Sequence, residues 1–176
     1  GLGGIGLSVA KRAKRFDMKV IYYDITRKKD AENMMNILYV SLDELLKRSD
    51  FVSIHAPLTK QTFHLVGEKE LRMMKETAYI INTSRGQLID EEALNKALNE
   101  GWIAGAGLDV FEKEPLPTDS SLAKLDNVIL TPHVGGATTD CRRNLALTAA
   151  ENIIKVLQGN LPERENIINP EVTEQR

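Results

Sequence analysis

Short apolar runs alternate with amphipathic segments along this chain, a pattern typical of strands separated by helices. Apolar, β-branched or aromatic runs of strand length predict strands at 18–23, 51–55, 79–82, 103–110 and 128–130. Helical periodicity and capping signals predict helices at 7–16, 42–48, 68–75, 90–99 and 139–158. Because the strands are apolar without alternation, we expect βα units in a parallel sheet that helices cover on both faces. The predicted fold class is α/β with a doubly wound parallel sheet.

Capping signals at the helix ends set the boundaries of the predicted elements. Ser41 opens a capping box, and Asp90 is a favourable N-cap. Gly159 closes the last long helix, as a C-terminal capping glycine does, and a polar stretch follows it. We therefore assign 1–159 to one domain and 160–176 to a C-terminal tail.

Composition and charge narrow the classes of function. The 176 residues carry a formal net charge of −2, with basic residues scattered among acidic ones, so the chain lacks the basic stripe that nucleic acid requires. Cys141 is the only cysteine, which excludes an intrachain disulfide and a cysteine-rich metal site and is typical of a reducing compartment. No apolar run reaches about eighteen residues, and the start shows no signal peptide. We expect a cytoplasmic protein with no metal, membrane or nucleic-acid partner.

The chain opens with Gly1, Gly3 and Gly6 directly before a predicted helix. Asp24 ends the next predicted strand, about twenty residues on, as the dinucleotide-binding fingerprint requires. The glycines allow a tight turn, close approach of a pyrophosphate and close helix packing, and the helix N-terminus attracts phosphate. An aspartate at this position would accept hydrogen bonds from ribose hydroxyls and repel the extra phosphate of NADP, which favours NAD. Arg27 is a competing signal, because a nearby arginine can accept that phosphate.

The fingerprint normally follows a strand, but no residue precedes Gly1. In a doubly wound sheet that first strand is central. We therefore expect the first strand to be absent and two strand edges to be unpaired. Either the chain is a truncated protein or another polypeptide supplies the strand.

Five motifs occur in the order found in a known family and extend over nearly the whole chain. They are Gly1 to Gly6, Ser53 to Thr59, Ile81 to Gly86, Gly107 to Pro115 and Thr131 to Gly136. On these motifs the chain resembles the D-isomer-specific 2-hydroxyacid dehydrogenases, such as the D-lactate, glycerate, hydroxypyruvate or glyoxylate, and D-3-phosphoglycerate enzymes. The resemblance implies a Rossmann-type domain inserted into a second, substrate-binding domain. Most of that second domain would be absent here, apart from the tail.

The resemblance also implies three catalytic residues. His133 would be the acid/base, Glu114 its orienting partner, and Arg85 the clamp for the substrate carboxylate. Histidine suits its role because its unperturbed pKa lies near operating pH, and the planar arginine fork matches a carboxylate. Glu112 competes for the carboxylate role, but the match to the Glu-Pro pair of the family favours Glu114.

The same resemblance implies a set of cofactor contacts. His55 and His64 match no catalytic position of the family, and we expect structural roles for them. The implied NAD-binding residues are Gly1, Gly3, Gly4, Ile5, Gly6, Asp24, Pro57, Thr83, Ser84, Arg85, Asp109, His133, Gly135 and Gly136.

The function implied by the resemblance is hydride transfer between NAD(H) and a small D-2-hydroxy acid or its 2-keto acid, by a homodimeric oxidoreductase. Glyoxylate, hydroxypyruvate, lactate and phosphoglycerate all stay open as substrates, because the discriminating residues come mostly from the other domain. One alternative is a non-catalytic NAD-sensing interaction module, as in the co-repressors that resemble this family. Another is a fragment with no activity by itself.

Overall fold

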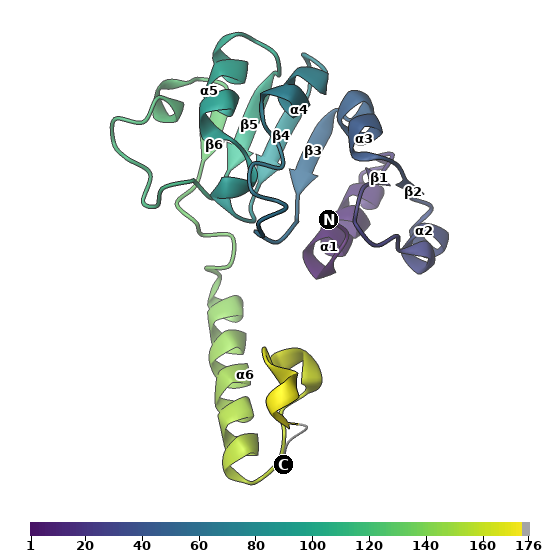
Figure 1. Ribbon diagram of the computed structural model, residues 1–176, viewed down its shortest axis with the longest axis vertical. Coiled ribbons are helices and arrows are strands. Elements are labelled where there is room, and N and C mark those ends of the chain that lie inside the picture. The colour runs from purple at the N-terminus through teal and green to yellow at the C-terminus, as the bar shows by residue number, and fades with distance from the viewer. Residues whose placement is uncertain (174–176) are drawn as a thin grey trace. The chain divides into compact units, whose positions relative to one another are not determined.

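The structure, a computed structural model, describes residues 1–173 and divides the chain into two compact units (Figure 1). The first unit is Gly1–His133, and the second begins at Val134. The sequence predicted one domain over 1–159 that includes the long helix, whereas the structure places that helix in the second unit. The last part of the predicted tail, 174–176, lies outside the described residues. The division of the chain into functional domains stays a prediction.

Every helix and strand predicted from the sequence is present, although several are shorter than predicted. The elements in chain order are α1 (Gly4–Arg15), β1 (Ile21–Tyr22), α2 (Lys29–Met35), β2 (Leu38–Tyr39), α3 (Leu42–Arg48), β3 (Phe51–Ile54), α4 (Glu68–Met73), β4 (Tyr79–Asn82), α5 (Glu91–Asn99), β5 (Gly105–Leu108), β6 (Val128–Leu130) and α6 (Thr139–Leu157). Short 3-10 helices lie at Gly86–Leu88, Leu122–Lys124, Arg164–Asn166 and Pro170–Thr173. The elements α2 and β2 were not predicted from the sequence, because a polar helix of 7 residues and a strand of 2 residues have little periodicity.

All strand pairs in the described residues are parallel. The strands β3, β4, β5 and β6 pair in this order and form a four-stranded sheet. The strands β1 and β2 form a separate two-stranded sheet. Parallel strands that alternate with helices confirm the predicted α/β fold of the Rossmann type.

Among the described residues, β1 pairs only with β2, and β3 pairs only with β4, so each of the two strands has one unpaired edge. A cavity of about 770 Å³ is lined by residues of both strands, of the glycine loop and of the C-terminal end of α3. The two unpaired strand edges expected from the sequence are therefore present in the first unit.

The main core lies between the four-stranded sheet and helices α3, α4 and α5, which lie side by side (Figure 1). Val52 and Ile80 project from the sheet into this core. Leu46, Leu71 and Leu94 come from the three helices and are fully buried. This packing holds the loops that follow the strands in fixed positions.

The opposite face of this sheet is the more exposed one. It carries Phe51 and Tyr79, whose stacked rings have centroids 5.6 Å apart, and Ile129, which is 74% exposed. Successive residues of a strand point to opposite faces, so β3 alternates between exposed and buried positions. Within the first unit, this exposed face differs from the expectation that helices cover both faces of the sheet. That expectation was based on apolar strand residues, which do not by themselves show which element covers them.

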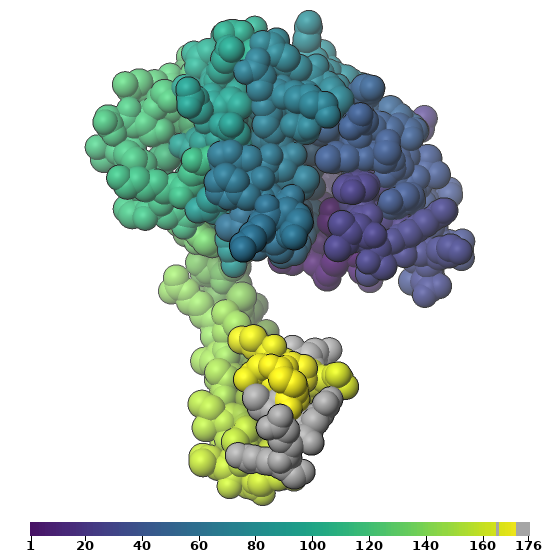
Figure 2. Space-filling view, in the orientation of Figure 1, coloured from purple at the N-terminus to yellow at the C-terminus, as the bar shows by residue number. Residues whose placement is uncertain are grey.

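The N-terminal elements have a smaller core of their own. Leu2 and Ala10 pack with Tyr22, Ala31 and Ile37 in one buried cluster. Figure 2 shows these elements in purple and dark blue beside the blue and teal elements of the larger core. Burial of Leu2 anchors the glycine loop next to the end of β1.

The second unit contains the long helix α6. Thr138 is its N-cap, and the hydroxyl oxygen accepts a hydrogen bond from the N–H of Cys141 at 3.1 Å. None of the α6 residues is buried in this structure. Among residues 1–173 no helix is both long enough and apolar enough to cross a lipid bilayer.

Candidate functional site

The predicted site residues of the first unit gather where the parallel strands end. The predicted residues Thr83 and Asp109 directly follow β4 and β5. His55 and Thr131, which were not predicted as site residues, directly follow β3 and β6. The carboxyl ends of parallel strands meet at one edge of a sheet, which is where ligands bind in open α/β sheets. Register and topology therefore bring together residues from four separate parts of the chain.

His133 and Glu114 form the central pair of this edge. The Nδ1 atom of His133 lies 2.7 Å from Oε2 of Glu114, and the N–H of Phe111 donates to Oε1 at 3.1 Å. The hydrogen bond with His133 is the main cause that lowers the pKa of Glu114, and the one from Phe111 lowers it further. An ionised carboxylate only accepts hydrogen bonds, so Nδ1 carries a proton and Nε2 is left for chemistry.

A cavity of about 540 Å³ lies beside this pair. Its lining residues come from the segment after β5, from the end of β6 and from the segment after β6, and they are Phe111, Glu114, Pro115, Leu116, Leu130, Thr131, Pro132 and His133. The cavity gives a small molecule access to the histidine, and most of its wall is apolar. Such a setting strengthens the few polar contacts that it contains.

Arg85 lies in the loop after β4 and is exposed. The loop is held by Asn82, which is 1% exposed: its amide donates to the carbonyl oxygen of Arg85 at 2.8 Å, and its side-chain oxygen accepts from the N–H of Ser84 at 3.0 Å. The hydroxyl of Ser84 donates to the carbonyl oxygen of Ile54. The positive charge of Arg85 is one of the smaller causes that lower the pKa of Glu114, so the two lie in the same neighbourhood.

Asn82 is a site residue that the sequence analysis missed. The available signal was an asparagine at the end of an apolar strand, because its side chain readily closes a turn over the next two residues. Its burial with both ends of the amide bonded shows that it shapes the loop that carries Thr83, Ser84 and Arg85.

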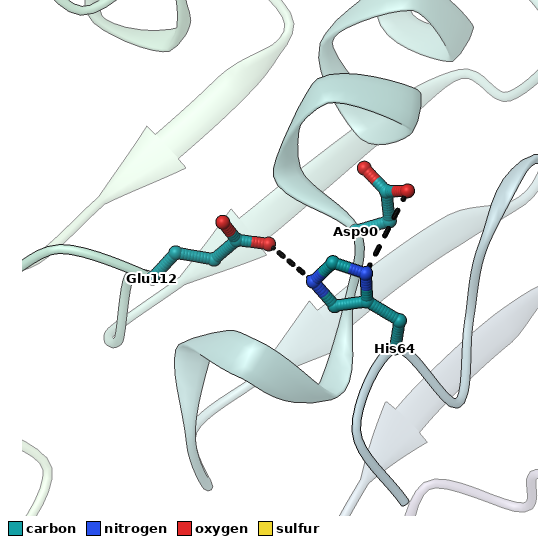
Figure 3. A group of neighbouring side chains, drawn as sticks. All are labelled: His64, Asp90 and Glu112. Carbon is teal, nitrogen blue, oxygen red and sulfur yellow. Dashed lines mark hydrogen bonds and ion pairs between the residues drawn. The ribbon is translucent and has the colours of Figure 1, made fainter.

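Glu112, the competing carboxylate, lies against a different histidine. Its Oε1 atom is 2.8 Å from Nε2 of His64, and the other ring nitrogen of His64 is 3.8 Å from Oδ2 of Asp90 (Figure 3). Potential ligand atoms of these three side chains lie within 4.8 Å of one another. Each ring nitrogen of His64 faces a different carboxylate, however. The histidine therefore connects the two acidic residues, and the three side chains do not direct their ligand atoms at a single metal position. The absence of a metal site stays a prediction.

The glycine loop leads into α1, which begins at Gly4. A Cβ atom at Gly3 or Gly4 would meet nothing within 4 Å, and no side chain of the described residues caps the start of this helix, so there is room for a ligand beside it. At Gly6 a Cβ would lie 2.2 Å from the carbonyl oxygen of Gly1, and only glycine fits there. Ile5 is 67% exposed in the same turn. Open amides at a helix N-terminus fit a dinucleotide pyrophosphate.

Asp24 connects the glycine loop to the end of β1. Its two carboxylate oxygens accept hydrogen bonds from the N–H of Leu2 at 2.6 Å and from the N–H of Thr26 at 2.9 Å. Partial burial opposes ionisation, but these hydrogen bonds outweigh it and lower the pKa of Asp24. The aspartate is therefore charged and held beside the loop, as a ribose-binding residue must be.

Arg27, the competing signal for NADP, is paired with Glu32. Its Nη2 and Nε atoms donate to the two oxygens of that carboxylate at 2.7 and 2.9 Å. The hydrogen bond from Arg27 is the main cause that lowers the pKa of Glu32 to about 2. This pairing occupies the guanidinium in the geometry with which it would otherwise bind a phosphate.

Two other predicted residues occupy different settings. Asp109 is 5% exposed, accepts a hydrogen bond from the hydroxyl of Thr131, and is held by its N–H, which donates to the carbonyl oxygen of Asn82. Pro57 is exposed, and its carbonyl oxygen accepts from the hydroxyl of Thr62 at 2.6 Å. Their contacts with a cofactor stay predictions.

Gly135 and Gly136 lie in a turn of the second unit, closed by a hydrogen bond from the N–H of Ala137 to the carbonyl oxygen of Val134. Their predicted contact with the cofactor also stays a prediction. His55 remains in the first unit, where its Nε2 atom lies 2.9 Å from the hydroxyl of Ser53. Burial lowers its pKa, in keeping with the structural role expected for it.

Curated proteins of similar sequence include several glyoxylate reductases. A glyoxylate reductase of Korarchaeum cryptofilum is 52% identical over 176 residues, and one of Thermofilum pendens is 54% identical over 177 residues. Each alignment covers 100% of this chain and 52% of the relative. The chain thus spans about half the length of the curated relatives that it matches.

Solved structures share the fold. The TT0316 protein of Thermus thermophilus superposes with a TM-score of 0.86 at 45% identity, over 92% of this chain and 50% of that one. A D-isomer specific 2-hydroxyacid dehydrogenase of Lactobacillus delbrueckii ssp. bulgaricus, in its NAD-complexed form, gives 0.86 at 38% identity, over 93% and 53%. Residues 1–135 match the family description "D-isomer specific 2-hydroxyacid dehydrogenase, NAD binding domain". The chain therefore belongs to the D-isomer-specific 2-hydroxyacid dehydrogenases and carries their NAD-binding domain.

Proposed function

We propose that the protein is an NAD-dependent oxidoreductase that interconverts a small 2-keto acid and the corresponding D-2-hydroxy acid, and that glyoxylate is its first substrate to test. The observation that carries this proposal is the bonded pair of His133 and Glu114, in the same neighbourhood as Arg85, at the carboxyl edge of the sheet. The named relatives above 50% identity are glyoxylate reductases, which supports the choice of glyoxylate.

Each side chain has a role that its chemistry allows. In the reducing direction, the protonated ring of His133 donates the proton on Nε2 to the carbonyl oxygen, which becomes the hydroxyl. The N–H at Nδ1 stays hydrogen-bonded to Glu114, which keeps the ring oriented during the transfer. In the oxidising direction, neutral Nε2 removes the proton from the hydroxyl.

Arg85 would hold the carboxylate of the substrate. A guanidinium has five N–H donors, and one nitrogen of Arg85, Nη1, donates to the carbonyl oxygen of Ser84 at 2.6 Å. The remaining donors suit a planar carboxylate, and the charge stays on arginine at any physiological pH. This contact would orient the keto group toward His133.

The residues of the glycine loop fit the cofactor of the family. The amides at the start of α1 would bind the pyrophosphate, and Asp24 would bind the adenosine ribose. When bound, NADH supplies the hydride that the carbonyl carbon receives. The carboxyl edge of the sheet, where Thr83 and Asp109 lie, would hold the nicotinamide end.

The non-catalytic NAD-sensing module has no specific observation in its favour. The matched relatives carry the names of reductases and dehydrogenases. We propose a homodimer with a cytoplasmic location, and light scattering on the whole protein tests the oligomeric state.

The experiment measures NADH binding by fluorescence and then NADH oxidation with glyoxylate, hydroxypyruvate and pyruvate in the whole protein. We expect turnover with at least one of these acids. The variant His133→Ala should abolish turnover and leave the Kd for NADH within about twofold, because the proton donor and the cofactor contacts are largely separate. Turnover that survives in His133→Ala would refute the acid/base role. If NADH binds but none of the three acids is reduced, the proposed reaction is refuted.

A further inference from the structure

Glu112 has a set of contacts that the proposed mechanism does not use. Its Oε1 atom accepts a hydrogen bond from the N–H of Glu91 at 3.2 Å and faces Nε2 of His64 at 2.8 Å (Figure 3). Its own N–H donates to Oε2 of Glu91 at 3.1 Å, and its carbonyl oxygen accepts from the amide of Gln87 at 2.9 Å. These contacts fasten both the side chain and the backbone of Glu112, which lies two residues before Glu114.

His64 extends this attachment to a third segment. Its Nδ1 atom lies 3.8 Å from Oδ2 of Asp90, and its N–H donates to the carbonyl oxygen of Gln87 at 2.8 Å. Its ring stacks on that of Phe63, with centroids 4.0 Å apart. Figure 3 shows the imidazole between the two carboxylates, one of which is the N-cap of α5. The histidine therefore joins the loop after β3, the start of α5 and the segment after β5.

The segments joined in this way are the ones that carry the catalytic groups. Gly86 directly follows Arg85, and a Cβ at Gly86 would lie 1.9 Å from the carbonyl carbon of Phe111. The N–H of Phe111 in turn donates to Glu114 at 3.1 Å. The backbone that carries Arg85 thus lies in direct contact with the backbone that carries Glu114, and the hydrogen bond from the Gln87 amide to the carbonyl oxygen of Glu112 holds the same two segments together.

We propose that Glu112 and His64 are positioning residues, which hold the Arg85 loop and the Glu114 segment in one arrangement. This inference rests on the proposed function. Without the link, Glu114 could move relative to His133, and misplacement by about an ångström is enough to slow a catalysed step markedly. The effect should fall mainly on kcat and less on NADH binding, because Asp24 and the glycine loop, which would bind the adenosine ribose and the pyrophosphate, lie on other elements.

The test uses single variants and a double-mutant cycle in the whole protein. Glu112→Ala removes the acceptor, whereas Glu112→Gln removes only the charge and keeps an oxygen for Glu91 and His64. We expect kcat with glyoxylate to fall about tenfold in Glu112→Ala and by less than about twofold in Glu112→Gln, with a change of less than about threefold in the Kd for NADH in both. Glu44→Ala, which removes an exposed ion pair with Arg48 on α3, is the matched control.

The double-mutant cycle separates positioning from a general structural effect. If Glu112 acts through Glu114, adding Glu112→Ala to Glu114→Gln should lower kcat by less than about twofold. A further tenfold fall in the double variant would overturn the proposal, and so would a kcat in Glu112→Ala equal to that of the wild type. If Glu112→Ala does not fold, His64→Ala takes its place, with an expected fall of about threefold and the same dependence on Glu114.

A second measurement keeps this proposal distinct from the proposed function. Nitrogen NMR of the neutral ring of His133 should show the proton on Nδ1 in the wild type and in Glu112→Gln, and a mixture of tautomers in Glu112→Ala. The tautomer of His133 can be measured without turnover. If the protein reduced none of the three acids, the proposed reaction would be refuted, but the tautomer would still test whether Glu112 positions the Glu114 segment. An unchanged tautomer in Glu112→Ala would overturn the positioning role.

Discussion

Gly86→Ala tests how closely the two catalytic segments must approach. The added Cβ would lie 1.9 Å from the carbonyl carbon and 2.0 Å from the carbonyl oxygen of Phe111, and 2.4 Å from the nitrogen of Glu112. Ordinary contacts between carbon atoms are about 3.5 Å, so the two segments would have to separate by roughly 1.5 Å. All three neighbours are backbone atoms, so no side chain can rotate away to make room.

Two effects of different kind should follow from this separation. Overpacking should lower the free energy of unfolding by ~1–3 kcal/mol, measured by urea denaturation. Displacement of Arg85 relative to Glu114 should lower kcat/KM with glyoxylate on the order of a hundredfold, measured from NADH oxidation. The Kd for NADH should change much less than kcat/KM, because Asp24 and the glycine loop lie on other elements and only the contacts at the nicotinamide end are displaced.

Gly107→Ala is the matched control, because it adds the same methyl group to β5. The nearest neighbour of its Cβ would be a side-chain carbon of Ile81 at 3.8 Å, which is ordinary contact. We expect its stability to stay within ~0.5 kcal/mol of the wild type and its turnover to be unchanged. A Gly86→Ala variant that matches Gly107→Ala in both measurements would refute the reasoning about the close contact.

Three further predictions concern the cofactor and the catalytic carboxylate. Glu32→Gln removes the charge that pairs with Arg27, so the released guanidinium should tighten NADPH binding on the order of threefold to tenfold. Fluorescence titration checks this, and adding Arg27→Ala should cancel the gain. Asp24→Asn should weaken NADH binding about tenfold or more, since hydrogen bonds to a charged group contribute ~1.5–3 kcal/mol; an unaltered ratio of NADH to NADPH affinity would reject the ribose role. Hydrogen bonds, first the one from His133, lower the pKa of Glu114 below its ordinary 4.5. Its stabilising contribution is therefore present above pH 4.5 and is lost as pH falls through the folded-state pKa. Acid unfolding of the wild type compared with Glu114→Gln measures this contribution, and coincident curves would contradict it.

Local sequence signals predicted much of the fold correctly. The capping residues Ser41 and Asp90 accept the hydrogen bonds expected of them, from the N–H groups of Glu44 and Ala93. The helices at 42–48 and after Asp90 therefore begin where the sequence indicated. Caps and apolar runs act over a few residues, so the chain itself encodes them without knowledge of its partners.

Elements with weak local signals were missed for the corresponding reason. The strand β2 has only 2 residues, and its place beside β1 depends on pairing with a neighbouring strand. The helix α2 buries only Ala31, so it has no apolar face that a periodicity could reveal. Tertiary contacts, more than local preference, stabilise such short elements.

The sequence by itself determined which candidate groups the chain offers, because the family resemblance of its motifs implies Arg85, Glu114 and His133 as catalytic residues and favours Glu114 as the partner of His133. Only the tertiary structure showed that Glu112, the competing carboxylate, meets His64. Glu114 and His133 are 19 positions apart in the sequence, whereas Glu112 and His64 are 48 positions apart. These contacts depend on sheet register and on how loops from different strands pack, and both are properties of the folded chain.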